Sequence, residues 1–291
     1  MSTITSLISS GGGGGSNVND IKFTNNTASL ITTESGEVWL KGGVAETDFA
    51  TYPDATTVLG YSGTSFSLGS IGGVSITWDG TYLWVLNVYD DTVYKYNTSF
   101  VYQNVSFSVA AQDTDPQGIV WDGTHFWVCG NATDTVYKYN ASGVYQNVSW
   151  STGAQVRPTD ITWDGTYFWV VDKTLDAVYK YNASGVYQNF NFSVVAQDSN
   201  PEGLAWDGTH LWVAGLYRDT AYKYNTSGVY QNESVYLGNQ NTLPYGITWV
   251  GTHFWVTGLT PKSAFKYQTQ IGIEARNLAG TGEGHNYVRI K

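Results

Sequence analysis

Hydrophobic residues in this chain gather in short runs that are separated by glycine-containing turns. Typical runs are Gly246-Ile247-Thr248-Trp249 and 125–128 (HFWV), and they lack the 3.6-residue periodicity of an amphipathic helix. The runs are rich in aromatic and β-branched residues, which favour the pleated surface of a sheet. The pattern therefore predicts an all-β fold of many short strands.

The runs recur in a repeat of about 43 residues. Trp-Asp-Gly-Thr occurs four times and Trp-Val-Gly-Thr once, and the five motifs begin at Trp78, Trp121, Trp163, Trp206 and Trp249. A second tryptophan follows each of these six residues later, and a Tyr-Lys-Tyr segment (Phe-Lys-Tyr in the last repeat) comes after it. Self-similarity at a fixed period is the signature of a repeat architecture.

Each repeat predicts four antiparallel strands. The first strand ends at the first tryptophan, Asp-Gly forms a type I′ hairpin turn, and the second strand contains the second tryptophan. The third strand is centred on Tyr-Lys-Tyr and ends at a turn such as 140–143 (NASG), which leads to a fourth strand such as 144–150. A four-stranded repeat of this length is typical of a β-propeller blade.

The last repeat contains three strands, up to Tyr267, and no fourth. A matching segment, 63–68 (GTSFSL), precedes the first repeat, and its Phe66 lies 12 residues before the tryptophan where the next repeat has 14. We predict that this segment completes the fifth blade and closes the ring, which hides the sheet edges. The expected fold class is an all-β, five-bladed β-propeller of four-stranded antiparallel blades, with six blades as the alternative.

The repeated aromatic residues have two interpretations. Large side chains at the same positions of every blade are what the packing of blade against blade requires, and we favour this interpretation. The alternative is a platform for stacking carbohydrate. The lysine of Tyr-Lys-Tyr is expected to lie along an aromatic ring. The aspartate of the hairpin turn is expected to serve the turn and not a metal, since Val250 replaces it in the last repeat.

Two connections of each repeat are nearly uniform tight turns, whereas the other two vary in sequence. The varying ones join the second strand to the third and one blade to the next, so antiparallel geometry places them on one face of the ring, here called the loop face. Binding residues are commonly found on such loops over a fixed scaffold. The candidate ligand contacts are Tyr89, Asn131, Arg157, Lys173, Tyr217 and Arg218, with Asp113, Asp115 and Asp198 as further polar groups. The alternative interpretation is ordinary solvated loop.

Composition and motifs narrow the function. With 14 Lys and Arg against 24 Asp and Glu, the formal net charge is −10, which argues against nucleic acid as a partner. Cys129 is the only cysteine and no zinc-ligand spacing occurs, so no metal and no cofactor are expected. No catalytic motif stands out, which predicts no catalytic residues and a chain that is not an enzyme. No apolar run is long enough to span a bilayer, and the N-terminal segment lacks the pattern of a signal peptide.

Segments outside the repeats resemble a known class of protein. Residues 36–44 (GEVWLKGGV) and 52–55 (YPDA) resemble the N-terminal part of tailed-phage virion proteins of the tail-fibre type, and 287–291 (YVRIK) is similar to the C-termini of phage structural proteins. The repeats resemble those of phage-encoded adhesins and of NHL-type or lactonase-like propellers. They differ from WD40 repeats, because Trp-Asp lies between the first and second strands.

The resemblance implies a virion protein that is assembled in the bacterial host cytoplasm. We expect an attachment region at 1–57 with a glycine-rich stretch, a propeller at 58–268 and a C-terminal extension at 269–291. The attachment region would contact other virion proteins, several copies would form a homo-oligomer on the particle, and one propeller face would recognise host surface glycan as a tail-fibre adhesin does. A non-catalytic capsid decoration or tail scaffold protein is the alternative, and a polysaccharide-degrading enzyme is a third.

Overall fold

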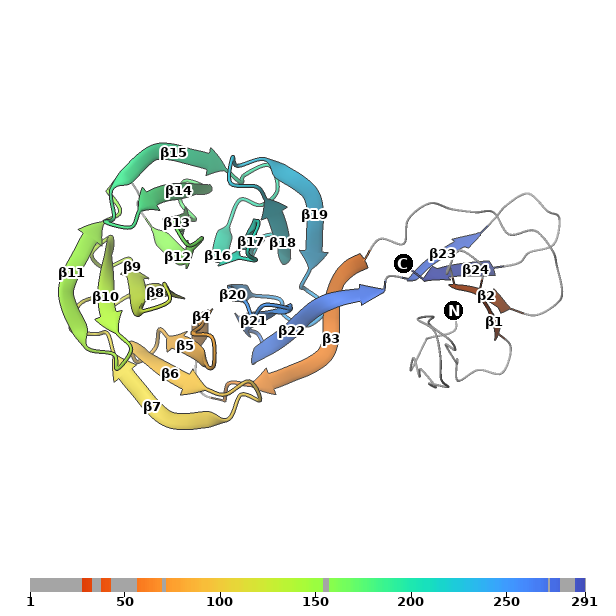
Figure 1. Cartoon of the computed structure of the whole chain (residues 1–291), viewed down its shortest axis with the longest axis horizontal. Coiled ribbons are helices and arrows are strands. Elements are labelled where there is room, and N and C mark those ends of the chain that lie inside the picture. Colours follow the sequence, from red (N-terminus) through yellow and green to blue (C-terminus); the bar gives the residue numbers. More distant parts are fainter. Residues whose placement is uncertain are drawn as a thin grey trace. The chain divides into compact units, whose positions relative to one another are not determined.

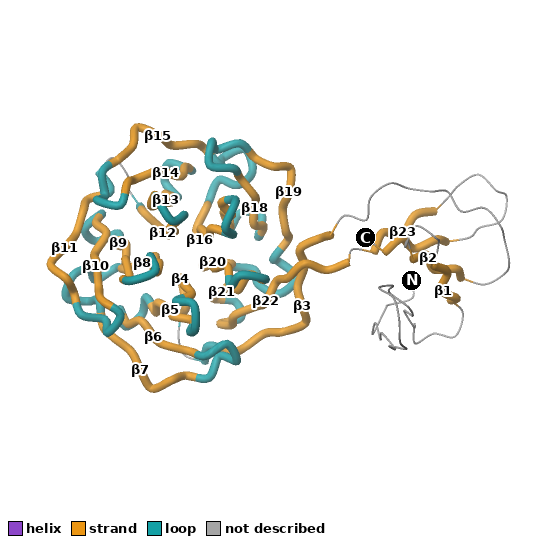
Figure 2. Tube along the Cα trace, viewed as in Figure 1, coloured by secondary structure: helices purple, strands orange, loops and turns teal. Residues whose placement is uncertain are grey.

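The computed structural model describes residues 28–32, 38–42, 57–69, 72–153, 157–271, 273–277 and 286–290. These residues form strands, turns and loops, and no helix occurs among them (Figure 2). The chain divides into two compact units, one of Leu59–Gln268 and one that combines Met1–Val58 with Thr269–Lys291. The domain boundaries expected from the sequence stay predictions.

The larger unit is a five-bladed β-propeller of four-stranded antiparallel sheets (Figure 1). The first blade consists of β4 (Gly73–Trp78), β5 (Leu83–Asn87), β6 (Thr92–Tyr96) and β7 (Tyr102–Ser108). The second consists of β8 (Pro116–Trp121), β9 (His125–Gly130), β10 (Thr135–Asn140) and β11 (Tyr145–Ser151). The third consists of β12 (Pro158–Trp163), β13 (Tyr167–Asp172), β14 (Ala177–Asn182) and β15 (Tyr187–Ser193). The fourth consists of β16 (Pro201–Trp206), β17 (Leu211–Gly215), β18 (Thr220–Tyr224) and β19 (Tyr230–Tyr236).

The fifth blade joins the two ends of the repeat region. It consists of β20 (Pro244–Trp249), β21 (His253–Leu259), β22 (Lys262–Ile271) and, as its outermost strand, β3 (Thr57–Ser67). The backbone N–H of Leu68 donates to the carbonyl of Lys262 at 2.9 Å at the end of this pairing. The predicted fold class, including closure of the ring by an early strand, is therefore confirmed.

The smaller unit contains one four-stranded sheet of order β1-β2-β24-β23. Its strands are β1 (Ala28–Thr32), β2 (Val38–Gly42), β23 (Ile273–Asn277) and β24 (Asn286–Ile290). Trp39 of β2 pairs with Arg289 of β24, so parts of the two segments with phage resemblance lie in adjacent strands. The glycine-rich stretch 11–15 and the segment 52–55 lie outside the described residues.

The hairpin turn between the first and second strands differs from the prediction. In the Asp-Gly turn of the first blade, Gly80 has a positive φ of 96° but Asp79 does not, so the turn is not type I′. Asp79 instead closes the turn with its side chain: Oδ1 accepts the backbone N–H of Tyr82 at 2.6 Å, and Oδ2 accepts the indole N–H of Trp84 at 2.6 Å. The carboxylate therefore fastens the turn to the core, which goes beyond the turn preference inferred from the sequence.

The second tryptophan of each repeat is a core residue. The five side chains are at most 3% exposed and pack between neighbouring blades; the indole of Trp127, for example, lies 4.9 Å from the ring of Phe168 in the next blade. In the first four blades the lysine of Tyr-Lys-Tyr lies over an aromatic ring of the same blade, as with Lys95 at 3.7 Å from the ring centre of Tyr82. The packing interpretation is confirmed, and burial of these large rings is the main stabilisation of the ring of blades.

Candidate binding face

In the second, third and fourth blades, one buried polar side chain fixes the loop between the second and third strands. In the second blade, Asp113 accepts hydrogen bonds from the backbone N–H and the hydroxyl of Thr133 at 3.2 and 2.6 Å. In the fourth blade, Asp198 accepts the backbone N–H groups of Tyr217 and Arg218 at 3.3 and 2.9 Å. Both aspartates are only 2% exposed. They hold loops in place and do not present themselves to a ligand.

The length of the connection that precedes a blade determines which residue caps its loop, that is, which side chain accepts the loop's N–H groups. Gly130 and Gly215 end the second strands of these two blades, and a Cβ at either position would collide with the capping carboxyl group. In the third blade the preceding connection is one residue shorter, and Asp172 at the end of β13 accepts the backbone N–H groups of its own loop. The loop face is therefore rigidly held, although its sequence varies.

The two most exposed tyrosines of the described residues occupy the same loop position in different blades. Tyr89 of the first blade is 63% exposed and Tyr217 of the fourth is 72% exposed. Each precedes by two residues an aspartate with positive φ, 52° at Asp91 and 48° at Asp219. The same backbone geometry thus presents both rings, and Lys262 adds a cation 4.7 Å from the ring centre of Tyr89.

The other sequence-predicted residues are spread over the face. Arg218 is exposed beside Tyr217 in the fourth blade, and Asn131 lies half-buried in the second. Lys173 forms an ion pair with Glu202 at 2.8 Å, and Arg157 is exposed. The six candidates therefore do not converge on one site. Arg157 and Lys173 lie near Glu202, Tyr89 lies near Tyr245, and Tyr217, Arg218 and Asn131 belong to the loops of other blades.

We call four residues the axial cluster: Arg157, Lys173, Glu202 and Tyr245. Glu202 and Tyr245 are the second residues of the innermost strands β16 and β20, which lie near the axis (Figure 1). Burial raises the pKa of Glu202, and the nearby charges of Lys173 and Arg157 oppose this effect. Burial also raises the pKa of Tyr245, with Glu202 as a neighbour. The cluster combines a buried acid, two cations and a phenol.

Below this cluster the axis is filled by polar side chains. Asp160 is buried and accepts hydrogen bonds from the hydroxyl of Ser75 and the backbone N–H of Leu204, both at 2.8 Å. The equivalent residues of the other three blades are glycines, and a Cβ at Gly118 would lie 2.6 Å from the Cα atom of Asp160. Burial raises the pKa of Asp160 well above its usual value despite these hydrogen bonds.

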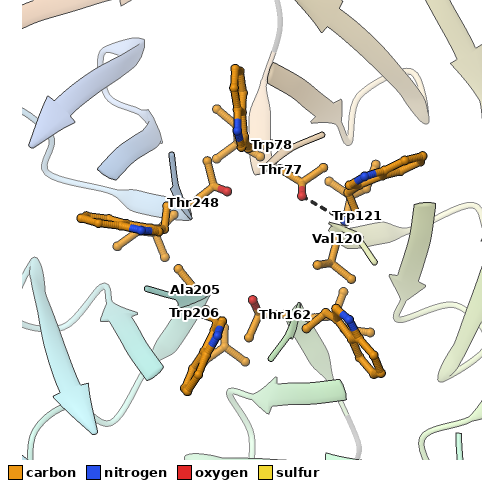
Figure 3. A pocket seen from close by; sticks show the side chains of 15 residues that line it. Thr77, Trp78, Val120, Trp121, Thr162, Ala205, Trp206 and Thr248 are labelled. Carbon is orange, nitrogen blue, oxygen red and sulfur yellow. Dashed lines mark hydrogen bonds between the residues drawn. The ribbon is translucent and has the colours of Figure 1, made fainter. Parts of the chain in front are cut away.

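The opposite end of the axis holds a cavity of about 120 Å³. Thr77, Thr162 and Thr248 point toward the centre, with Val120 and Ala205 between them, and the first tryptophans of the repeats radiate outward (Figure 3). The innermost strands end here at the Asp-Gly turns, so this cavity belongs to the uniform face. Its lining is nearly the same in every blade, which suits a ring core better than a selective site.

Sequence reasoning missed Glu202 and Tyr245. Both are the second residues of their strands, directly after the variable connections between blades, and their counterparts are Val74, Gln117 and Thr159. Five different residues at one position, next to strand residues that hardly vary, is the signal that could have identified them. No group of three or more potential metal ligands occurs among the described residues.

Comparison with known proteins identifies the fold but no family. No protein-family model matches the chain, and no curated protein matches it significantly. Among solved structures, the glutaminyl cyclase of Myxococcus xanthus is similar, with a TM-score of 0.58 and 8% identity over 73% of this chain and 97% of that one. The virginiamycin B lyase of Staphylococcus aureus has a TM-score of 0.45 and 13% identity, over 83% and 94% of the two chains. The likeness to the cyclase shows a shared fold.

The prediction that the chain is not an enzyme is wrong, because it was drawn only from the absence of catalytic motifs. The sequence excluded catalysis because no catalytic motif stood out, yet the glutaminyl cyclase is an enzyme with the same fold at 8% identity. The propeller is therefore compatible with catalysis, and fold and function have to be argued separately. Among the described residues, no helix has the length and apolar character needed to cross a membrane.

Proposed function

We propose that this chain is a phage virion protein that recognises host surface glycan through the loop face of its propeller. The observation that carries the proposal is Tyr217, a ring that is 72% exposed on a loop whose backbone is held by the buried Asp198. A tyrosine side chain has an apolar ring that can stack against a sugar and a hydroxyl that can form hydrogen bonds. Because the loop is already fixed, binding would require little ordering of the protein.

Two further features support recognition by this face. Tyr89 repeats the arrangement in the first blade, and Arg218 places a guanidinium beside Tyr217. Two separate positions on one ring, and several copies on a particle, would raise the overall affinity without new contacts. The virion role and the homo-oligomeric state rest on the sequence resemblance of the terminal segments, and immunodetection of the chain on purified particles tests them.

The chain itself indicates a safe substitution. The position of Tyr217 is occupied by Ala132 in the second blade, so Tyr217→Ala gives the fourth blade a residue that this loop already accepts elsewhere. The experiment is a glycan array with the wild type, Tyr217→Ala, Tyr89→Ala and Val144→Ala. Val144 is 57% exposed beside the outer strand β11, far along the chain from both loops, and serves as the control.

We expect the wild type and the control to bind the same glycans, and each tyrosine variant to lose signal. Absence of binding by the wild type, together with a loop face covered by other virion proteins, would replace the proposal by a capsid decoration or tail scaffold role. Release of reducing sugar from the bound polysaccharide would add an enzymatic step to recognition.

A further inference from the structure

Glu202 is a buried acid, and only one of its two carboxylate oxygens has a hydrogen-bond partner among the described residues. The residue is 3% exposed, and its Oε1 accepts a hydrogen bond from Lys173 at 2.8 Å. Its Oε2 is also buried and has no hydrogen-bond partner among the described residues. A buried carboxylate oxygen without a partner costs free energy, so its retention needs an explanation.

The second blade shows that the fold does not require this arrangement. Gln117 occupies the same strand position there and donates to Asp115 of its own blade at 2.5 Å. Val74 and Thr159 occupy it in the first and third blades. A neutral residue therefore satisfies the backbone geometry at this position, and the acid of the fourth blade is a local feature of the loop face.

The surroundings of the free oxygen select the charge of a ligand. A cationic ligand would meet Lys173 and Arg157, whose charges already act on Glu202. An anionic group has no proton to donate to Oε2, so it would leave this oxygen unpaired even though Lys173 and Arg157 would attract it. A neutral hydroxyl can donate to Oε2 and accept from the ammonium group of Lys173, and the half-buried ring of Tyr245 is the apolar neighbour.

We propose that the axial cluster binds one neutral sugar residue of the recognised glycan, with a sugar hydroxyl donating to Oε2 of Glu202. This inference rests on the proposed function and assigns it a second position, separate from Tyr217. The axial cluster supplies the polar recognition, since a hydrogen bond to a carboxylate is stronger and more selective than one between neutral groups. Tyr217 supplies stacking at the periphery.

The test uses saturation-transfer NMR with the full chain and a panel of methyl glycosides, followed by titration calorimetry with the glycan selected on the array. The first variant is Glu202→Gln, because the equivalent position of the second blade holds glutamine. The second is Lys173→Leu, because the equivalent position of the fourth blade holds Leu216. Glu233→Gln is the matched control, because Glu233 of the outer strand β19 also forms an ion pair with a lysine, Lys223, at 2.8 Å. Melting temperatures confirm that each variant is folded.

We expect Glu202→Gln and Lys173→Leu to abolish the methyl glycoside signal and to weaken the glycan at least tenfold, while Glu233→Gln is unchanged. If Glu202→Gln binds like the wild type while Tyr217→Ala does not, the axial inference fails and the proposed function stands. If the wild type binds no glycan, both fail.

Discussion

Ser75 of the first blade donates a hydrogen bond of 2.8 Å to Asp160 of the third, above Gly118 of the blade between them. The hydroxyl of Ser75 in turn accepts the backbone N–H of Ile119 at 3.1 Å. Four blades are thus connected at one point, because Asp160 also accepts from Leu204 of the fourth. This small network ties the innermost strands together beneath the axial cluster.

Replacing Asp160 by glycine, the residue of three other blades, should destabilise the ring. The variant leaves a void and removes the acceptor from Ser75 and from the backbone N–H of Leu204. We expect a loss of about 2–4 kcal/mol in the free energy of unfolding, measured by urea denaturation. An unchanged midpoint would show that the network is not stabilising.

Low pH should weaken the hydrogen bonds by which the aspartate of the hairpin turn holds the turn to the core tryptophan. Two backbone N–H groups and the indole of Trp212 hydrogen-bond to Asp207 and lower its pKa, against the opposing effect of burial. A carboxylate whose pKa is lower in the folded than in the unfolded chain stabilises the fold at pH values above its pKa in the unfolded chain. This contribution is lost as the pH falls through its pKa in the folded chain. The difference in stability between the wild type and Asp207→Asn should therefore be about 1–3 kcal/mol at pH 7 and should shrink below pH 4. A difference that does not change with pH would contradict this role.

The fifth blade offers a substitution that should stabilise the protein. Val250 stands where the other blades have aspartate, and the indole N–H of Trp255 is buried without a hydrogen-bond partner among the described residues. Val250→Asp provides the missing acceptor and should raise the free energy of unfolding by about 1 kcal/mol, measured by thermal melting. The reverse change, Asp207→Val in the fourth blade, is the matched control and should lower it. A loss of stability in both would refute the explanation.

The closing strand should be essential for cooperative folding. Phe66 of β3 lies 5.2 Å from the ring of Phe100 and 5.6 Å from that of Trp255, so it joins the fifth blade to the first. Deletion of residues 1–70 removes this strand, and we expect loss of the cooperative melting transition. Phe66→Ala should give a graded loss of about 3 kcal/mol. An unchanged melting curve for the deletion would contradict closure by β3.

The repeat made the fold predictable from the sequence. The nearly equal spacing of Trp78 and its four counterparts indicated the number of blades, and the three-stranded last repeat indicated the closure. The 42-residue interval before Trp163 also has a structural cause. The connection before the third blade is one residue shorter there, and Asp172 of β13 caps the loop instead of a residue from that connection. The type I′ turn was predicted wrongly, since the Asp79 side chain and not its backbone conformation closes the turn.

The site was less predictable, because side-chain partners across blades are not visible in one sequence. Asp113 and Asp198 resemble free loop acids in the sequence, yet both are buried caps. Lys173 was identified as a candidate, but its partner Glu202 was not, since 29 residues separate them in the chain. Exposed positions such as Tyr217 were easier to identify, because variable loops lie on the surface.

A crystal structure of the chain with the array-selected glycan would show which face of the propeller binds it. We expect a sugar ring stacked on Tyr217 or Tyr89, within van der Waals contact of the phenol. Density on the opposite face, over the ring of first tryptophans around Thr77, Thr162 and Thr248, would contradict it and would revive the tryptophan platform as the binding surface.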